Sequence, residues 1–221
     1  MKPCLSLNPS LILPILPAVW LMFLTPLFAA TGTQSSGKSQ PEFQQNLPVL
    51  MYHYIRTVSD RQTDPVGFNL SVTQPDFTAQ VNYLVTHGYS AITPTDLSEA
   101  LHDGRSLPAK SVLLTFDDGY EDFYGVAFPI LRRYNLKATL FVVTNFISRR
   151  DGRYITWEQL RELDNSGLIT IGAHTRYHSD LTQVSSARAE LEIRGSRDAL
   201  EKFLGHPVTA FAYPGGRLNE L

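Results

Sequence analysis

The sequence predicts an α/β fold with a parallel sheet, and three observations carry this prediction. Short apolar runs alternate with segments of helical periodicity from residue 47 onward. Capping residues mark where several of the helical segments begin and end. We find no internal repeat in the sequence. Alternation of this kind requires crossover connections, and these place helices outside a parallel sheet.

Six apolar runs are predicted to be strands. They are 48–52, 89–92, 111–116, 138–143, 168–173 and 208–213. The run at 111–116 reads SVLLTF and does not alternate with charged residues, which is typical of a strand buried on both faces.

Five segments between these runs are predicted to be helices. They are 76–88, 95–104, 122–135, 156–167 and 185–205. Thr156 and Gln159 have the spacing of a capping box. Gly88 and Gly104 suit the C-terminal caps of their helices. Gly195 is expected to interrupt the last helix.

An open doubly wound sheet and a (β/α) barrel both fit this order of elements. In both, the residues that act on ligands gather at the C-terminal ends of the strands. Polar or aromatic residues follow four of the predicted strands. They are His53, the pair Asp117–Asp118, His174, and Tyr213 with Pro214. We therefore expect these residues on one rim of the sheet.

The N-terminal residues differ from the rest of the chain. Lys2 is followed by an apolar stretch at 11–30 that ends in small residues, as in a secretory signal peptide. Prolines inside the stretch argue against a well-formed membrane-spanning helix, although an uncleaved anchor is an alternative. We predict a signal peptide or anchor at 1–32, a flexible linker at 33–46 and one folded domain at 47–221. The domain is then secreted, periplasmic or at the cell surface.

Composition excludes several classes of function. The chain has 221 residues, with 19 basic and 21 acidic side chains and a formal net charge of −2. No basic run stands out, so composition gives no support for nucleic-acid binding. The single cysteine, Cys4, excludes a disulfide framework and a zinc site built on cysteines. Any metal must therefore bind to histidine, aspartate or glutamate.

Two adjacent aspartates at the end of a buried strand indicate a nearby cation, because like charges resist ionising together. The segment HTRYH spaces His174 and His178 by four, which on a helical turn puts both imidazoles on one face. With Asp118 they form a two-histidine, one-carboxylate set that leaves other metal positions open. Asp117 is then free to take a proton from water whose pKa the ion lowers.

Each motif alone is weak evidence. Paired aspartates before a glycine often form only a turn, and most pairs of histidines at this spacing bind nothing. The position of both motifs at the ends of predicted strands favours a functional role for them. Zinc is the default divalent ion for two imidazoles and a carboxylate, and cobalt or nickel can occupy the same set.

The motifs TFDDG at 115–119, HTRYH at 174–178 and FAYPGG at 211–216 resemble, in this order, those of the polysaccharide deacetylase family, carbohydrate esterase family four. The segments at 47–55 and 88–97 resemble the subgroup that deacetylates biofilm poly-N-acetylglucosamine. The resemblance covers nearly everything from Leu47 onward. It implies a distorted (β/α) barrel and the metal-dependent removal of acetyl groups from an N-acetylated polysaccharide.

The resemblance also implies roles for matching residues. Asp117 would be the catalytic base, and one divalent ion would be held by Asp118, His174 and His178. The backbone at Tyr213 would help to hold the oxyanion.

Two further residues, Pro214 and His53, are placed at the substrate site by the same resemblance. A packed histidine at a strand end is the alternative for His53. The expected partner is an N-acetylated polysaccharide, and membrane attachment is expected only through the N-terminal segment.

The sequence departs from the family pattern in three places. Ala212 stands where many relatives carry an arginine that steadies the base, and Gly215 stands where an aromatic residue is usual. The family also carries a late histidine that acts as general acid, whereas no histidine follows His206 in this chain. We therefore expect a barrel that is incomplete at its C-terminus.

Other functions stay open on the sequence alone. The same chemistry could act on peptidoglycan or on chitin oligomers, and an O-acetyl ester could be attacked at the same site. A non-catalytic glycan-binding protein, left by loss of the last strands, is the alternative of another class.

Overall fold

The structure is a computed structural model and describes residues 20–22 and 46–218. Its strands are β1 (Trp20–Met22), β2 (Val49–Tyr52), β3 (Tyr54–Ile55), β4 (Ser71–Val72), β5 (Ser90–Ile92), β6 (Ser111–Phe116), β7 (Ala138–Val142) and β8 (Ile169–Ala173). Its α-helices are α1 (Pro65–Leu70), α2 (Gln74–Thr86), α3 (Pro94–Asp103), α4 (Phe128–Arg133), α5 (Trp157–Asn165) and α6 (Ser186–Leu204). A π-helical turn at Phe123–Ala127 leads into α4, and 3₁₀ turns cover Leu181–Gln183 and Pro214–Gly216.

The main sheet has the strand order β1-β2-β6-β7-β8, and β5 pairs with the first half of β6. Its strands run parallel except for β1, which is antiparallel to β2. Strands β3 and β4 form a separate parallel pair. Helices lie in the crossovers from β6 to β7 and from β7 to β8, so the predicted alternation produces βαβ units.

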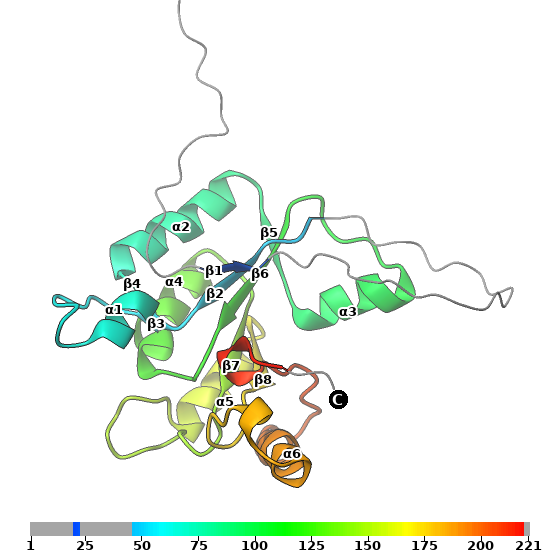
Figure 1. Cartoon of the computed structure of the whole chain (residues 1–221). Coiled ribbons are helices and arrows are strands. Elements are labelled where there is room, and N and C mark those ends of the chain that lie inside the picture. The colour runs from blue at the N-terminus through cyan, green and yellow to red at the C-terminus, as the bar shows by residue number, and fades with distance from the viewer. Residues whose placement is uncertain (1–19, 23–45, 219–221) are drawn as a thin grey trace, which may run out of the picture.

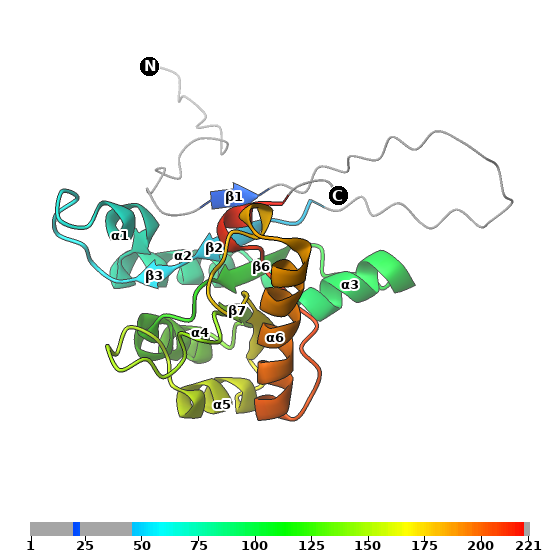
Figure 2. The same ribbon diagram turned by 60° about the horizontal axis from the view of Figure 1, so that its bottom comes forward.

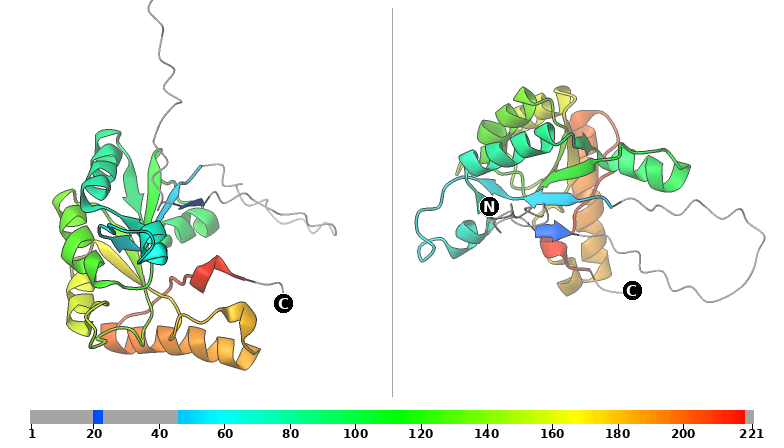
Figure 3. Two further views of the ribbon diagram at one scale, coloured as in Figure 1. Left: turned by 60° about the vertical axis from the view of Figure 1, so that its left-hand side comes forward. Right: turned by 90° about the horizontal axis from the view of Figure 1, so that it is seen from above.

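Helices α2, α4, α5 and α6 cover the sheet from one side (Figure 1). Helix α6 runs beside the strands, and both α5 and α6 pack against β8 (Figure 2). Seen from the side, these helices follow the curvature of the sheet (Figure 3). The predicted α/β fold with a parallel sheet and outer helices is confirmed. In the part of the chain that the structure describes, the strands form a curved sheet and not a closed ring.

The centre of the sheet is buried on both faces, as a parallel sheet between other layers requires, and β6 and β7 are apolar apart from Ser111, Thr115 and Thr139. The ring of Tyr52 stacks on Phe116 with centroids 5.0 Å apart, and Phe77 of α2 meets Tyr52 edge-on at 5.3 Å. These aromatic contacts fix α2 over the ends of β2 and β6. His53 directly follows β2, and Asp117 directly follows β6. The same packing therefore fixes the positions of these two residues.

The predicted helix signals are confirmed in part. Thr156 and Gln159 form the reciprocal hydrogen bonds of a capping box at the start of α5. Gly104 ends α3 in a left-handed conformation with φ of 70°. The expected interruption at Gly195 is wrong, because α6 continues through it for 19 residues. Packing of one face of α6 outweighs the low helix propensity of a single glycine.

The last predicted strand, 208–213, is also wrong as a strand. Only one bridge forms there, between Phe211 and Ala173 at the end of β8. The backbone N–H of Val208 donates instead to the Glu201 carboxylate at 3.0 Å. A side chain of α6 thus satisfies a group that would otherwise pair in a ladder.

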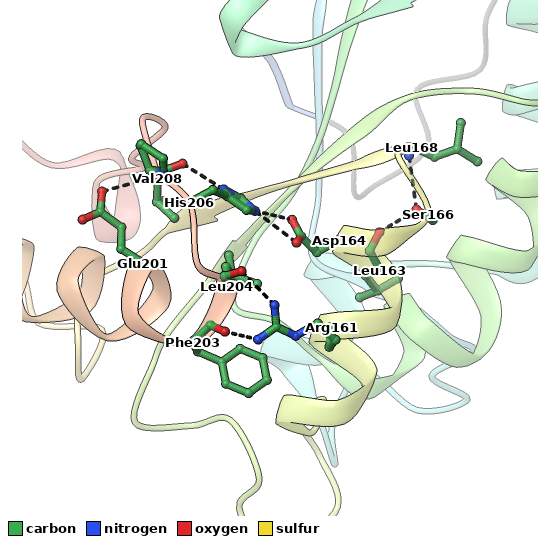
Figure 4. A network of polar contacts seen from close by, with 11 residues as sticks. Arg161, Leu163, Asp164, Ser166, Leu168, Glu201, Phe203, Leu204, His206 and Val208 are labelled. Carbon is green, nitrogen blue, oxygen red and sulfur yellow. Dashed lines mark hydrogen bonds and ion pairs between the residues drawn. The ribbon is translucent and has the colours of Figure 1, made fainter.

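The C-terminal end of α6 is tied to α5 by side chains (Figure 4). Arg161 donates to the carbonyls of Phe203 and Leu204, the second at 2.8 Å, and its guanidinium lies over the Phe203 ring. His206 Nε2 lies 3.0 Å from both carboxylate oxygens of Asp164. A cation at the end of a helix satisfies free carbonyls and complements the helix dipole.

The predicted signal or anchor at 1–32 and the linker at 33–46 lie outside the described residues, apart from β1 and residue 46. Within 20–22 and 46–218, no helix combines the length and the hydropathy that a membrane crossing requires.

Candidate active site

The ends of the parallel strands bring the predicted site residues to one rim. Strands β2 and β6 end in register, with Tyr52 opposite Phe116, and β8 ends level with β7. Because the strands run parallel, the residues that follow them share one edge of the sheet. These residues are His53 after β2, Asp117 and Asp118 after β6, and His174 after β8.

A tight turn places the two aspartates. Asp118 and Gly119 both have left-handed backbone, with φ of 73° and 75°. A Cβ at position 119 would lie 3.0 Å from Val142 Cγ1, so glycine is needed for conformation and for space. Asp117 and Asp118 are each 8% exposed. Backbone strain at a non-glycine residue is typical of functional sites, and here it falls on the predicted metal ligand.

Asp118, His174 and His178 form a candidate metal centre. Asp118 Oδ1 lies 3.5 Å from His174 Nε2 and 3.3 Å from His178 Nε2. One ligand atom from each residue lies within 4.8 Å of the others. Asp118 Oδ1 is buried and has no hydrogen-bond partner, which is unfavourable unless a cation occupies the space between the three groups. The donor set therefore fits a divalent ion.

The ring of His174 is held in the orientation that a ligand needs. Its Nδ1 lies 2.9 Å from the Ala212 carbonyl and donates a hydrogen bond to it. This bond leaves Nε2, which faces Asp118, as the nitrogen with the free electron pair. Burial lowers the pKa of His174 to about 4, so the imidazole is neutral near pH 7. A neutral imidazole is the form that binds a metal.

The histidine pair is brought together by a loop, and the expectation of a helical turn at HTRYH is wrong. Residues 174–178 have no helical hydrogen bonds, and Thr175 and His178 adopt left-handed backbone with φ of 64° and 59°. The two imidazole centroids lie 5.0 Å apart. The two histidines, four residues apart, are therefore brought together by two left-handed residues and not by a helical turn.

Asp117 has surroundings that suit a base. Burial, followed by the charge of Asp118, raises the pKa of Asp117 to about 7. His53 Nε2 lies 4.0 Å from Asp117 Oδ2, and burial lowers the pKa of His53. A carboxylate that titrates near neutrality can accept a proton during a reaction, and a cation nearby would favour its ionised form.

Tyr213 and Pro214 directly follow Ala212, whose carbonyl accepts the hydrogen bond from His174. Tyr213 is 46% exposed, and its ring meets that of Phe211 edge-on at 5.1 Å. Pro214 is buried and begins a 3₁₀ turn. Roles of Tyr213 in catalysis and of Pro214 in substrate binding stay predictions.

A group of tyrosines beside the aspartates is absent from the predicted site. Tyr54 and Tyr120 stack with centroids 3.9 Å apart, and Tyr154 stacks on Tyr120 at 5.1 Å. The guanidinium of Arg56 covers the Tyr54 ring at 3.8 Å. Burial, with a contribution from Asp118, raises the pKa of Tyr120 well above its usual value. The only sequence signal is the position of Tyr120 directly after the aspartate turn.

A model of the family described as polysaccharide deacetylase matches residues 104–221. The match contains the predicted base, metal ligands and oxyanion residue but not His53.

Three similar proteins illustrate the likeness. YxkH of Bacillus subtilis (strain 168), whose name assigns it to the polysaccharide deacetylases, is 34% identical over 174 residues, which are 79% of this chain and 58% of that protein. The poly-β-1,6-N-acetyl-D-glucosamine N-deacetylase of Staphylococcus epidermidis (strain ATCC 35984) is 26% identical, covering 89% of this chain and 74% of its own length. The structure of the Streptococcus pyogenes deacetylase PplD in complex with acetate is 36% identical, with a TM-score of 0.72 and coverage of 79% of this chain and 76% of that one. The chain thus spans less than two thirds of the Bacillus subtilis relative.

Proposed function

Because this chain belongs to the polysaccharide deacetylase family, we propose that it is a metal-dependent hydrolase that removes N-acetyl groups from polysaccharide containing N-acetylglucosamine. The observation that carries the proposal is the group of Asp118, His174 and His178, which lies directly beside a second aspartate. Two relatives support the choice of the acetyl group. One is named as a poly-β-1,6-N-acetyl-D-glucosamine N-deacetylase, and the other holds acetate, the product that hydrolysis of an acetamido group releases.

One divalent ion would be held by Asp118, His174 and His178. Zinc suits two imidazoles and a carboxylate, with cobalt or nickel as alternatives. The ion would supply Lewis-acid chemistry, which lowers the pKa of water and polarises an amide carbonyl. The hydrogen bond from His174 to the Ala212 carbonyl fixes the ring nitrogen that faces Asp118.

Asp117 would move the protons. As a general base it takes a proton from the attacking water, and burial raises its pKa above the usual value of an aspartate, which strengthens it as a proton acceptor. The backbone N–H at Tyr213 would donate to the carbonyl oxygen as negative charge develops there. When the carbon–nitrogen bond breaks, the departing amine needs a proton, which the protonated Asp117 can return.

The polymer of N-acetylglucosamine is the first substrate to test. Peptidoglycan and chitin oligomers carry the same acetamido group, so they are the alternatives for the same chemistry. An O-acetyl ester is a weaker alternative, since its leaving group is an alcohol and not an amine.

The test is release of acetate from poly-β-1,6-N-acetylglucosamine, chitin and peptidoglycan fragments, with added zinc. The full chain is compared with Asp118→Ala and with Asp103→Ala, which removes an exposed carboxylate at the end of α3. We expect acetate from the parent and from Asp103→Ala, and none from Asp118→Ala or after chelation. Release by Asp118→Ala at the parent rate would contradict the proposal. Glycan binding without acetate release by the parent would instead indicate a non-catalytic glycan-binding protein.

We also propose that the protein is exported, on the basis of the apolar stretch at 11–30 after Lys2. N-terminal sequencing of protein recovered from the envelope and the medium is the test. A start near residue 30 supports cleavage, and an intact Met1 in the membrane fraction supports an anchor. An intact Met1 in the cytosolic fraction alone would refute export.

A further inference from the structure

Glu192 lies midway along α6, and its side chain is completely buried. It belongs to none of the motifs that predict the site. Removing a carboxylate from water is unfavourable unless hydrogen bonds and a paired cation compensate for it. The contacts of Glu192 therefore indicate why the fold keeps a charge in this place.

The two oxygens of Glu192 differ, because Oε2 accepts hydrogen bonds whereas Oε1 has no hydrogen-bond partner and only an ion pair. Oε2 accepts hydrogen bonds from the backbone N–H groups of Arg176, at 2.9 Å, and Tyr177, at 3.0 Å. Oε1 lies 2.6 Å from the guanidinium of Arg188, one turn earlier on the helix. Oε2 thus binds the loop, and the charge of the carboxylate is neutralised by Arg188 of the same helix.

The two N–H groups that Glu192 binds lie between the two histidines of the candidate metal centre. The backbone N–H groups of Thr144 and Asn145, which follow β7, donate to the carbonyls of Thr175 and Arg176 at 3.2 and 3.0 Å. The loop is therefore held both by the segment after β7 and by one carboxylate of α6. Such a clamp is needed because the loop reverses its backbone twice in left-handed conformations.

Gly195 is a second feature of α6 that serves the same loop. A Cβ at this position would lie 2.6 Å from Arg176 Cδ, so any larger residue would push the Arg176 side chain away. Glycine weakens the interior of a helix. Two residues that are unfavourable for an ordinary helix, a buried glutamate and a glycine, thus both contact the histidine loop.

We propose that Glu192 is a positioning residue of the metal centre, holding the backbone of the loop so that His178 faces Asp118 and His174. His178 needs such support because its side chain is 39% exposed, whereas that of His174 is only 2% exposed and its ring is bonded to Ala212. Outer partners of this kind orient the ligands that touch a metal. The inference rests on the proposed metal centre.

The test measures zinc affinity by competition with a chelator for the full chain and for Glu192→Gln and Glu192→Ala. The visible spectrum of the cobalt-loaded protein reports the ligand geometry, and thermal unfolding of the metal-free protein reports stability. Glu190→Gln is the matched control, because Glu190 lies on the same helix but is exposed and paired with Arg194 at 3.1 Å.

We expect Glu192→Ala to bind zinc roughly 10–100-fold more weakly than the parent, with an altered cobalt spectrum. Glu192→Gln should fall between the two, because its amide oxygen can still accept from the loop. Glu190→Gln should match the parent. Parent-like zinc affinity and cobalt spectrum in both Glu192 variants, whatever their stability, would overturn the inference and leave the proposed function standing. Failure of the parent itself to bind zinc would overturn the proposed metal centre and the inference with it.

Glu192→Gln keeps the inference testable if Glu192→Ala does not fold, because it removes the charge and keeps the shape of the side chain. Gly195→Ala is a second control on the same helix, since it leaves the carboxylate in place and displaces only the flexible side chain of Arg176. We expect its zinc affinity and cobalt spectrum to match those of the parent. A loss of zinc affinity in Gly195→Ala as large as in Glu192→Ala would show that any change in α6 disturbs the centre, which would overturn the specific role of Glu192.

Discussion

Asp117 and Asp118 are neighbours in the chain but meet different surroundings. Asp118 Oδ1 has imidazole nitrogens at 3.5 and 3.3 Å, whereas Asp117 Oδ2 has the imidazole of His53 at 4.0 Å. The surroundings of Asp118 suit the binding of a cation. Asp117 is a buried carboxylate with a pKa of about 7. Two identical side chains can therefore hold different roles because their neighbours differ.

Asp117→Asn should remove deacetylation and leave zinc bound. The amide keeps the size of the side chain but cannot accept the proton, and general-base help is typically worth ~10²–10⁴ in rate. The measurements are acetate release and zinc content of the purified variant. Loss of zinc together with activity would show that Asp117 is itself a ligand.

The sequence could supply the candidate ligands because their spacing and their places after strands are local features. The path between the two histidines could not be predicted, since left-handed backbone at Thr175 and His178 depends on the clamp from β7 and α6. The role of Glu192 could not be predicted for the same reason. A glutamate within a helical pattern is ordinarily an exposed residue, and only the packed structure shows it buried.

At the scale of helices and strands, long apolar runs and capping signals were the most informative. The runs that became β6, β7 and β8 are continuous because both faces are covered. The two-residue strands β3 and β4 and the six-residue helix α1 were not predicted, because elements this short carry no periodic pattern. At 208–213, an apolar run resembles a strand whether or not a ladder forms beside it.

Thr156→Ala should destabilise the protein by ~1 kcal/mol, because it removes the hydroxyl that caps α5 by accepting a hydrogen bond from the backbone N–H of Gln159. Chemical denaturation followed by circular dichroism measures the change. Thr78→Ala is the control, since the exposed Thr78 hydroxyl bonds only within α2. Equal effects of the two substitutions would show that the cap contributes nothing specific.

The link between His206 and Asp164 should make stability depend on pH. The hydrogen bond to Asp164 raises the pKa of His206, and a bond to the Pro207 carbonyl adds to this. A raised pKa in the folded state stabilises the protein fully below the unfolded value, about 6.5, and this stabilisation is lost as pH rises through the folded pKa.

Asp164→Asn should therefore be less stable than the parent at about pH 5.5, by no more than about 1 kcal/mol for so exposed a pair, and similar to it at about pH 9. Chemical denaturation at both pH values measures the difference. Asp198→Asn, which removes one of the two carboxylate partners of Arg197, should show no such change with pH. If the free energy of unfolding differs between the parent and Asp164→Asn by the same amount at both pH values, the link is ruled out.

At the scale of the whole molecule, the candidate metal centre joins segments that lie far apart in the sequence. Asp118 follows β6, His174 follows β8, and Ala212 belongs to the segment that bridges to β8. The centre therefore connects the middle of the sheet with the chain beyond α6. An ion bound there would hold these parts together and so stabilise the folded state as a unit.

Zinc should raise the unfolding temperature of the full chain. At a free concentration of 100 times the dissociation constant, binding adds ~2.7 kcal/mol, which corresponds to roughly 5–10 °C for a domain of this size. Differential scanning calorimetry with and without zinc measures the shift. His178→Ala should lose most of it, whereas the exposed His87→Ala should retain it. Equal shifts in both variants would place the ion elsewhere.

The hydrogen bond between His174 and Ala212 also has a consequence for timing. The two residues are 38 positions apart, so during synthesis the histidine emerges well before its acceptor exists. Until the later segment arrives, a neutral imidazole carries its proton on either nitrogen, and either nitrogen can capture an ion. Zinc that is present while the chain folds can thus bind Nδ1, which in the folded protein donates to Ala212. Zinc that is added after folding can bind only Nε2, so the two orders of addition follow different routes to the same centre.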